Sequence, residues 1–289
     1  MCSILVQQTM KIYPLSRSIL IILTLISISI SVQASHPKRI ISLSGSITEV
    51  LDGLGIGKQI VAVDLTSDYP AYIAALPKVS KNRSVTIESL SSFRPDLVLA
   101  LEGELAADVQ VQLQKLKIPY VLIKQEFSKI GLQNFILNIA KSVNQVEKGQ
   151  QLAQNLDKEL TALMNKSKNS AQKVLFIYAR GAGHMSVAGQ QTAVDAVISN
   201  AGFKNAMKGF TGYKTYNTEA LVAANPDVIL MFNFGLSSLG GAEGIANMPG
   251  VKLTKAGKNK RIVSMDASLL NNYSLRLPEA ISKLQQLVL

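Results

Sequence analysis

Short apolar runs alternate with helical patterns along most of the chain. The runs that predict buried strands cover residues 39–44, 60–63, 118–123 and 173–179. Runs of this length between polar or Gly-rich segments are typical of strands in a parallel sheet that is covered on both faces. A helix is predicted over residues 47–54, with Ser46 as its N-cap and Glu49 closing a capping box. Strands that alternate with helices in this way indicate an α/β fold.

One helix–strand phrase occurs twice, once in each half of the chain. Residues 88–99 read ESLSSFRPDLVL, and residues 219–230 read EALVAANPDVIL. Each copy predicts a short helix that begins near a Glu, a Pro that stops it, and a buried strand. The shared spacing favours duplication over chance. We therefore predict two Rossmann-like α/β lobes joined by a long α-helix, with a ligand cleft between the lobes.

The joining segment lies between the two copies. Apolar residues recur at helical spacing from about Leu132 to about Lys166 with no proline, which predicts mostly continuous helix with a weak point at Gly149. A helical strut resists wide hinge motion, so we expect small closing movements. The predicted boundaries are an N-terminal α/β lobe over residues 35–130, a linking helix over 131–170 and a C-terminal α/β lobe over 171–289.

The N-terminal segment, residues 1–34, has the pattern of a cleavable signal peptide. Lys11 and Arg17 precede an apolar stretch over residues 18–32, and a small-x-small site ends at Ala34. A retained membrane anchor is the alternative interpretation. The single cysteine, Cys2, lies ahead of the apolar stretch. An exported mature chain would therefore have no disulfide, zinc-thiolate site or lipid-anchoring thiol.

Charge and motifs narrow the class of function. The chain carries a formal net charge of +11, which suits an anionic small ligand or an anionic surface. Export, scattered basic residues and the absence of Trp argue against nucleic acid. No GxSxG, HExxH or P-loop motif occurs, so we predict a binding protein rather than an enzyme. An enzyme acting in an α/β cleft is the alternative from another class.

Loops at the carboxyl ends of strands line the ligand crevice of open α/β sheets. Tyrosine and arginine there supply stacking faces and anion-binding forks, and histidine supplies a ring nitrogen. The candidate ligand-binding residues are Tyr69, Tyr72, Lys81, Arg83, Arg180, His184, Tyr213 and Arg276. For each of them the alternative is an ordinary role in a surface loop.

Glu88 and Glu219 open the two copies of the repeated phrase. A carboxylate at the start of a helix complements the helix dipole, which is the structural interpretation. The functional interpretation is a pair of similarly placed acids, one on each lobe, offered to a partner with two matching basic sites.

Several segments carry a family resemblance that covers almost all of the mature chain. They include RIISLSGSITEVLDGLG, RGAGHMSVAGQQTAVDAVISNAGFKNA and GLSSLGGAEGIANMPGV. These segments resemble the periplasmic hemin-binding proteins of ABC importers, in a helix-linked group that also takes cobalamin and ferric siderophores. The resemblance implies a periplasmic protein that delivers heme to an ABC permease of the inner membrane. It also implies that Glu88 and Glu219 meet arginines of that permease. A binder of a corrinoid or ferric siderophore is the runner-up.

The resemblance also implies an axial iron ligand in the first lobe, a Tyr or sometimes a His, followed two residues later by a basic residue. Arg83 matches the basic residue, but Lys81 stands where the iron ligand is expected. Lysine must lose a proton to bind iron, whereas a neutral imidazole is available at pH 7. We therefore favour His184 as the heme-iron ligand, with Lys81, Tyr69 and Tyr72 as alternatives.

Overall fold

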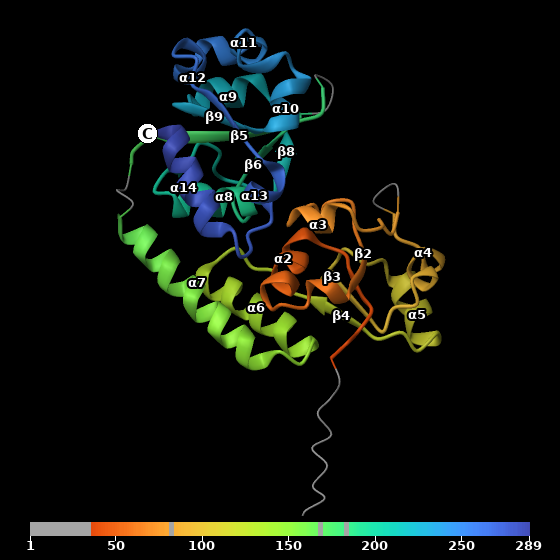
Figure 1. The fold of residues 1–289 in the computed structure, drawn as a ribbon. Coiled ribbons are helices and arrows are strands. Elements are labelled where there is room, and N and C mark those ends of the chain that lie inside the picture. The colour runs from red at the N-terminus through yellow and green to blue at the C-terminus, as the bar shows by residue number, and fades with distance from the viewer. Residues whose placement is uncertain (1–35, 81–83, 167–169, 182–184) are drawn as a thin grey trace, which may run out of the picture. The chain divides into compact units, whose positions relative to one another are not determined.

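The computed structural model describes residues 36–80, 84–166, 170–181 and 185–289 (Figure 1). The predicted signal peptide over residues 1–34 lies outside these ranges, as do the candidate site residues Lys81, Arg83 and His184. Within the described ranges, no helix combines the length and the apolar character that crossing a membrane requires.

The first lobe is built on a four-stranded parallel sheet in the order β2-β1-β3-β4. Its strands are β1 (Ile40–Ser42), β2 (Ile60–Val63), β3 (Leu97–Leu101) and β4 (Tyr120–Ile123). Its helices are α2 (Gly45–Gly53), η1 (Gly57–Gln59), α3 (Ala71–Ala74), α4 (Ile87–Ser92) and α5 (Ala107–Lys115). Strands β1 and β3 are buried almost throughout, as their continuous apolar sequence predicts.

The second lobe has a mixed sheet in the order β10-β9-β5-β6-β8, with β7 beside β5. Its strands are β5 (Lys173–Ala179), β6 (Met185–Ala188), β7 (Lys204–Asn205), β8 (Tyr213–Thr215), β9 (Val228–Phe232) and β10 (Ile262–Met265). Strands β5, β9 and β10 are parallel, whereas β6 runs antiparallel to β5 and to β8. The antiparallel strands extend the sheet beyond the pattern of the first lobe.

The helices of the second lobe follow its strands along the chain. They are α8 (Ala193–Asn200), α9 (Thr218–Ala224), α10 (Asn233–Ser238), α11 (Gly241–Ala246), η2 (Val251–Leu253), α12 (Lys255–Lys258), α13 (Ala267–Asn271) and α14 (Leu277–Val288). Two lobes, one with a parallel sheet and one with a mixed sheet whose β10, β9 and β5 are parallel, confirm the predicted α/β fold class.

Both copies of the repeated phrase fold as predicted, α4 leading into β3 and α9 into β9. The repeated Asp has the same contact in each. The amide of Arg39 donates to Asp96 Oδ1 at 2.9 Å, and the amide of Lys173 donates to Asp227 Oδ2 at 2.8 Å. Each Asp amide donates back to the carbonyl of the same residue. The repeated Asp thus closes the amino end of the lobe's first strand.

The basic residues at these strand ends complete the arrangement. Arg39 Nη2 donates to the carbonyl of Phe93 at 2.6 Å, and Lys173 Nζ donates to the carbonyl of Ala224 at 2.5 Å. Both carbonyls lie at the end of a repeat helix, where cations complement the helix dipole. The duplication therefore includes the start of each lobe as well as the phrase itself.

The segment between the lobes differs from the predicted continuous helix. It forms two helices, α6 (Lys129–Ser142) and α7 (Val146–Lys166), with Asn144 between them in the left-handed region at φ 56°. Gln133 Nε2 donates to Asp157 Oδ1 at 2.6 Å, so the helices run antiparallel as a hairpin. The prediction of one helix over Leu132 to Lys166 is wrong. The long α7 remains, and its chain leads directly into the second lobe.

Gly149 marks close packing in this hairpin rather than a weak point. A Cβ built on Gly149 would lie 2.3 Å from the Cβ of Ala140 on the facing helix. The missing side chain lets α7 approach α6 here. The predicted lobe boundaries themselves stay predictions.

Candidate functional site

A cleft with a volume of about 980 Å³ lies between the carboxyl ends of the strands of the two sheets. The first lobe contributes residues that end or follow its strands, among them Leu43, Asp64, Leu101 and Gln125. The second contributes Tyr178, Phe232 and Asp266 from the corresponding ends of β5, β9 and β10. This is the place where open α/β sheets bind ligands.

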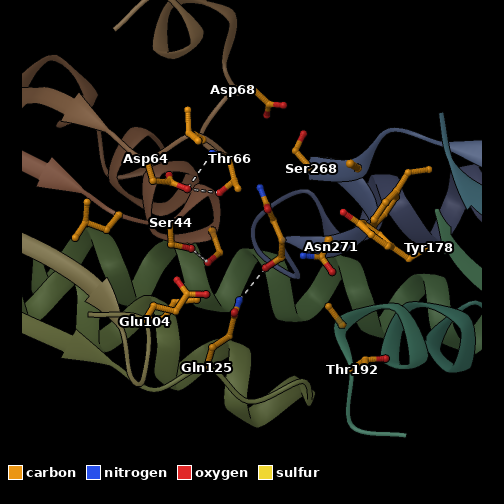
Figure 2. Close-up of a pocket in the computed structure, with 18 of the residues that line it drawn as sticks. Ser44, Asp64, Thr66, Asp68, Glu104, Gln125, Tyr178, Thr192, Ser268 and Asn271 are labelled. Atoms are coloured by element: carbon orange, nitrogen blue, oxygen red, sulfur yellow. Dashed lines mark hydrogen bonds between the residues drawn. The ribbon is translucent and has the colours of Figure 1, made fainter. Parts of the chain in front are cut away.

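The first-lobe wall of the cleft is polar and acidic. Figure 2 shows Ser44, Asp64, Thr66, Asp68 and Glu104 on this side. Asp64 is held by its own loop, because the amide of Thr66 donates to Asp64 Oδ2 at 2.9 Å. This wall offers oxygen atoms that accept hydrogen bonds from a ligand.

The second-lobe wall is aromatic. The ring centroid of Tyr178 lies 6.1 Å from that of Phe232 and 6.0 Å from that of Phe234, both in edge-to-face geometry. The guanidinium of Arg180 lies 5.3 Å from the ring centre of Phe234. Arg180 Nε donates to the Tyr178 hydroxyl at 2.7 Å. Such rings provide flat apolar surface with a few oriented polar atoms.

Tyr213 completes this wall from the first residue of β8. Burial raises the pKa of Tyr213 to about 12, and the neighbouring Tyr178 adds to the shift. The Tyr213 hydroxyl therefore keeps its proton at neutral pH.

The residues after β10 form the floor. Asp266 Oδ1 accepts from the Ser268 hydroxyl at 2.6 Å and from the amide of Leu269 at 2.9 Å. Burial alone would raise the pKa of Asp266, but these bonds and the charge of Arg276 outweigh it and lower the pKa. Gln125 Nε2 of the first lobe donates to the carbonyl of Asn272 at 2.8 Å (Figure 2).

A buried ion pair joins the lobes beside this floor. Arg276 Nη2 lies 2.7 Å from Glu49 Oε1, and the Glu49 side chain is 2% exposed. Burial raises the pKa of Glu49, although Arg276 and Asn272 oppose the shift. The predicted capping box is therefore wrong. The N-cap of α2 is Ser44, which makes no side-chain cap, and Glu49 turns to Arg276 instead.

Helix α2 packs closely on the segment around Arg276. A Cβ on Gly53 would lie 2.4 Å from Leu275 Cδ1, and one on Gly45 would lie 2.8 Å from Asn272 Nδ2. Glycines at both ends of α2 thus allow this contact between the lobes.

The structure brings some of the predicted site residues into the cleft. Arg180 and Tyr213 line it. Tyr69 lies outside it and stacks on Arg276, whose guanidinium is 3.8 Å from the ring centre. Tyr72 also lies outside, where its hydroxyl donates to Asp52. Lys81, Arg83 and His184 fall outside the described residues.

The aromatic wall and the acids opposite it were not predicted from the sequence. Tyr178, Phe232 and Phe234 belong to or follow apolar runs that predict buried strands. Their place at the carboxyl ends of those strands was the available signal. Among the described lining residues, Arg180 carries the only positive charge, against four acids: Asp64, Asp68, Glu104 and Asp266. The basic balance of the whole chain therefore does not extend to the described part of the cleft.

Glu88 and Glu219 are not among the residues that line the cleft, and they share one local setting. Each is the second residue of its helix and is exposed. Thr86 caps α4 through the Ser89 amide, and Asn217 caps α9 through the Ala220 amide. Since side chains at Thr86 and Asn217 already cap the helices, the two carboxylates are available to a partner.

Comparison with known proteins agrees with this geometry. The family described as periplasmic binding protein matches residues 40–269. The solved periplasmic heme-binding protein RhuT from Roseiflexus sp. RS-1 is 32% identical with a TM-score of 0.82, covering 87% of this chain and 97% of that one. The solved periplasmic heme-binding protein HutB of Vibrio cholerae is 30% identical with a TM-score of 0.78, covering 86% of this chain and 98% of that one.

Curated relatives point to the same class of protein. An uncharacterized ABC transporter substrate-binding lipoprotein, YvrC of Bacillus subtilis, is 27% identical over 87% of this chain and 80% of its own length. The vitamin B12-binding protein of Vibrio parahaemolyticus is 27% identical over 86% of this chain and 88% of its own length.

Proposed function

The chain belongs to the periplasmic binding protein family that serves ABC importers, and we propose that the cargo it captures is heme. The observation that carries the proposal is the wall formed by Tyr178, Phe232 and Phe234, which faces a polar wall across the cleft. A porphyrin is a flat apolar ring with charged carboxylates at one edge. Flat aromatic surface suits the ring, and a cation such as Arg180 suits the carboxylates.

The similarity to solved proteins named as heme-binding, at 30–32% identity across most of both chains, supports the same cargo. Heme carboxylates require positive partners. Arg180 supplies one in the described cleft. Lys81 and Arg83, which follow the lining residue Ser80 in sequence, are proposed as the others, and His184 or Lys81 are the sequence-based proposals for the iron.

Titration of the purified protein with hemin tests the cargo directly. We expect a Soret band that shifts and saturates near one heme per protein. A spectrum equal to that of free hemin at every ratio contradicts the proposal. Titration with iron-free protoporphyrin in parallel separates ring binding from iron ligation.

A corrinoid is the second candidate, favoured by the relative named as vitamin B12-binding and by the excess of acids in the described cleft. Calorimetry with cyanocobalamin distinguishes it. Binding of cyanocobalamin without binding of hemin would show that the cargo is a corrinoid and not heme. In either case we propose a carrier that releases its ligand unchanged, and not an enzyme.

The proposed partner is an ABC permease of the inner membrane, reached in the periplasm after export through the N-terminal signal. Glu88 and Glu219 are the proposed docking acids. Changing both to Ala is expected to abolish heme-dependent growth while hemin affinity stays within about twofold, because neither lines the cleft.

The matched control for docking is Glu279→Ala, which removes an exposed acid from the first turn of α14. This variant is expected to transport normally. A fall in hemin affinity equal to the fall in uptake would mean that Glu88 and Glu219 act on the binding site and not on the permease.

A further inference from the structure

The strongest feature outside the cleft is a cluster of basic residues on the second lobe. Basic residues are scattered over most of the chain, but residues 252–261 read KLTKAGKNKR, with five Lys or Arg and no acid. The whole chain has 30 basic residues in 289, about one in ten, so this segment is strongly enriched. It includes most of η2 and all of α12, and Figure 1 shows α12 near α11 and α9 in the second lobe.

The backbone folds this segment into a compact double turn. The Thr254 hydroxyl accepts from the Gly257 amide at 3.1 Å and caps α12. A Cβ on Gly257 would lie only 3.0 Å from Lys252 Cα, so α12 packs directly against η2. Thr254 and Ala256 are buried and hold the turn on the lobe. The backbone of Lys258, which follows Gly257, is therefore close to that of Lys252.

The outward face of this double turn is cationic. Lys252, Lys258 and Lys260 are exposed, and none of them forms an ion pair with an acid of the described ranges. Lys255 is the exception, since its Nζ lies 3.4 Å from Asp227 Oδ1. Unpaired like charges repel each other, so gathering them does not stabilise the folded protein. A partner with negative charge would offset this repulsion.

An exposed apolar side chain belongs to the same face. Leu253 follows Lys252 and is 57% exposed. Lysines beside a protruding apolar residue are typical of surfaces that lie on anionic bilayers. There the ammonium groups meet lipid phosphates, and the apolar side chain enters the boundary of the acyl chains. A soluble anion would give Leu253 no such apolar environment.

The position of the cluster also suits a membrane. Gly250 packs on the start of α9, because a Cβ there would lie 2.6 Å from Thr218 Cγ2. Thr218 directly precedes Glu219, the proposed docking acid. The Tyr216 hydroxyl donates to the Pro249 carbonyl at 3.3 Å and strengthens this contact. A lobe that docks a permease through Glu219 therefore brings the segment after Gly250 near the bilayer around that permease.

We propose that this basic face, formed by Lys252, Leu253, Lys255, Lys258 and Lys260, binds anionic phospholipid at the membrane that holds the permease. The lysines attract the headgroup phosphates, and Leu253 enters the interface. Binding keeps the protein near the bilayer, so that it searches for the permease along a surface. The inference goes beyond the proposed cargo, and only the argument from position rests on the proposed docking role of Glu219.

The test is sedimentation of the mature chain with lipid vesicles. Phosphatidylglycerol mixed with phosphatidylcholine supplies the anionic surface, and pure phosphatidylcholine supplies the neutral one. Wild type is expected to sediment with the anionic vesicles at low ionic strength and to be released as salt screens the charges. The cluster variant carries Lys252→Gln, Lys258→Gln and Lys260→Gln. At about fivefold for each lysine, its partition coefficient is expected to fall by about a hundredfold.

The matched control carries Lys58→Gln, Lys141→Gln and Lys158→Gln. These lysines are exposed and lie apart in η1, α6 and α7, so the control loses the same net charge from dispersed positions. It is expected to keep most of the wild-type partition. Leu253→Ser is expected to weaken binding a few-fold without changing its salt dependence, because it removes only an apolar contact.

Several results would overturn the proposal. Equal partition of wild type into anionic and neutral vesicles would exclude electrostatic lipid binding. An equal loss in the cluster variant and the control would show that net charge, and not this face, attracts the vesicles. Absence of vesicle binding, combined with loss of heme-dependent growth in the cluster variant, would assign the face to the permease instead.

This test is independent of the cargo. The lysines of the cluster variant do not line the cleft, so its hemin affinity is expected to equal that of wild type. If wild type fails to bind hemin but sediments with anionic vesicles, the proposed cargo is wrong and the lipid-binding face stands. If wild type binds hemin but not anionic vesicles, the cargo stands and the lipid-binding face is wrong.

Discussion

The two lobes are alike at the amino ends of their strands and different at the carboxyl ends. At the amino ends, Asp96 in one lobe and Asp227 in the other close the first strand in the same way. Arg94 and Asn225 even share the left-handed conformation, at φ 46° and 44°, between repeat helix and strand. At the carboxyl ends, acids and hydroxyls face an aromatic wall.

This difference shows how one lobe design can carry two chemically different cleft walls. The amino ends fix the fold, so both lobes use the same contacts there. The carboxyl ends line the cleft, and the walls that they form there differ in chemistry. The second lobe also carries the antiparallel strands β6 and β8, which bring Tyr213 to the cleft and have no counterpart among the described strands of the first lobe.

The largest effect on stability is expected where the lobes join, outside the repeat. Arg276→Met leaves Glu49 buried without its charged partner, and breaking such a pair costs about 3–5 kcal/mol. Urea unfolding of the ligand-free protein measures this loss.

The control for this variant is the pair Glu49→Gln with Arg276→Met, which removes both charges. We expect the double variant to recover part of the stability, because no uncompensated charge remains. A single variant as stable as wild type would show that the ion pair does not hold the lobes.

A smaller effect on stability is expected in the helical hairpin, which is also not part of the repeat. Gly149→Ala forces a methyl group against Ala140, since a separation of 2.3 Å between the two Cβ atoms is too short, and overpacking of this kind costs about 1–3 kcal/mol. Thermal unfolding provides the measurement. Adding Ala140→Gly to the same chain is expected to relieve the clash and to raise the melting temperature again. An unchanged melting temperature would show that this clash does not cause the loss of stability.

The repeat itself is tested by removing its two aspartates separately. Asp96→Ala and Asp227→Ala each remove hydrogen bonds between a carboxylate and a strand amide, worth about 1–2 kcal/mol at these partly exposed sites. Similar losses of unfolding free energy, measured by chemical denaturation, would support the equivalence of the two lobes. A loss in one variant alone would show that the shared geometry has unequal energetic value.

The smallest expected effect is on the pH dependence of the free energy of unfolding. Burial raises the pKa of Glu49 in the folded protein, so the folded state binds this proton more tightly than the unfolded chain does. The contribution of Glu49 to stability is therefore full at acid pH and falls as pH rises from about 4.5 toward the folded pKa. Stability of Glu49→Gln measured from pH 4 to pH 8 is expected to lack this component, and an unchanged slope would contradict it.

The parts of the fold that the sequence predicts are those with local signals. Strands β2 and β5 match their predicted runs, and both repeat units fold as the Pro-Asp spacing indicates. The break at Asn144 carries no Pro or Gly, and the same apolar period continues on both sides of it. Periodicity alone therefore could not distinguish one continuous helix from a hairpin of two helices.

The site was harder to predict because its key contacts join distant segments. Ser46 and Glu49 have the spacing of a capping box, yet Arg276, the actual partner of Glu49, is 227 residues away in sequence. Tyr178 ends an apolar strand and has the pattern of a core residue. Its contact with Arg180, two residues on, is local, but only the arrangement of the two lobes places both residues in the cleft.

The helical hairpin and the segment around Arg276 together have a mechanical consequence. The chain passes between the lobes through α6 and α7, which contact α2 on one side and α14 on the other. A second attachment, without covalent continuity, holds Arg276 and its neighbours on α2. A body fixed at one point can turn about three axes, whereas a body fixed at two points turns only about the line through them. We therefore expect the lobes to move relative to each other mainly by a torsion about that line.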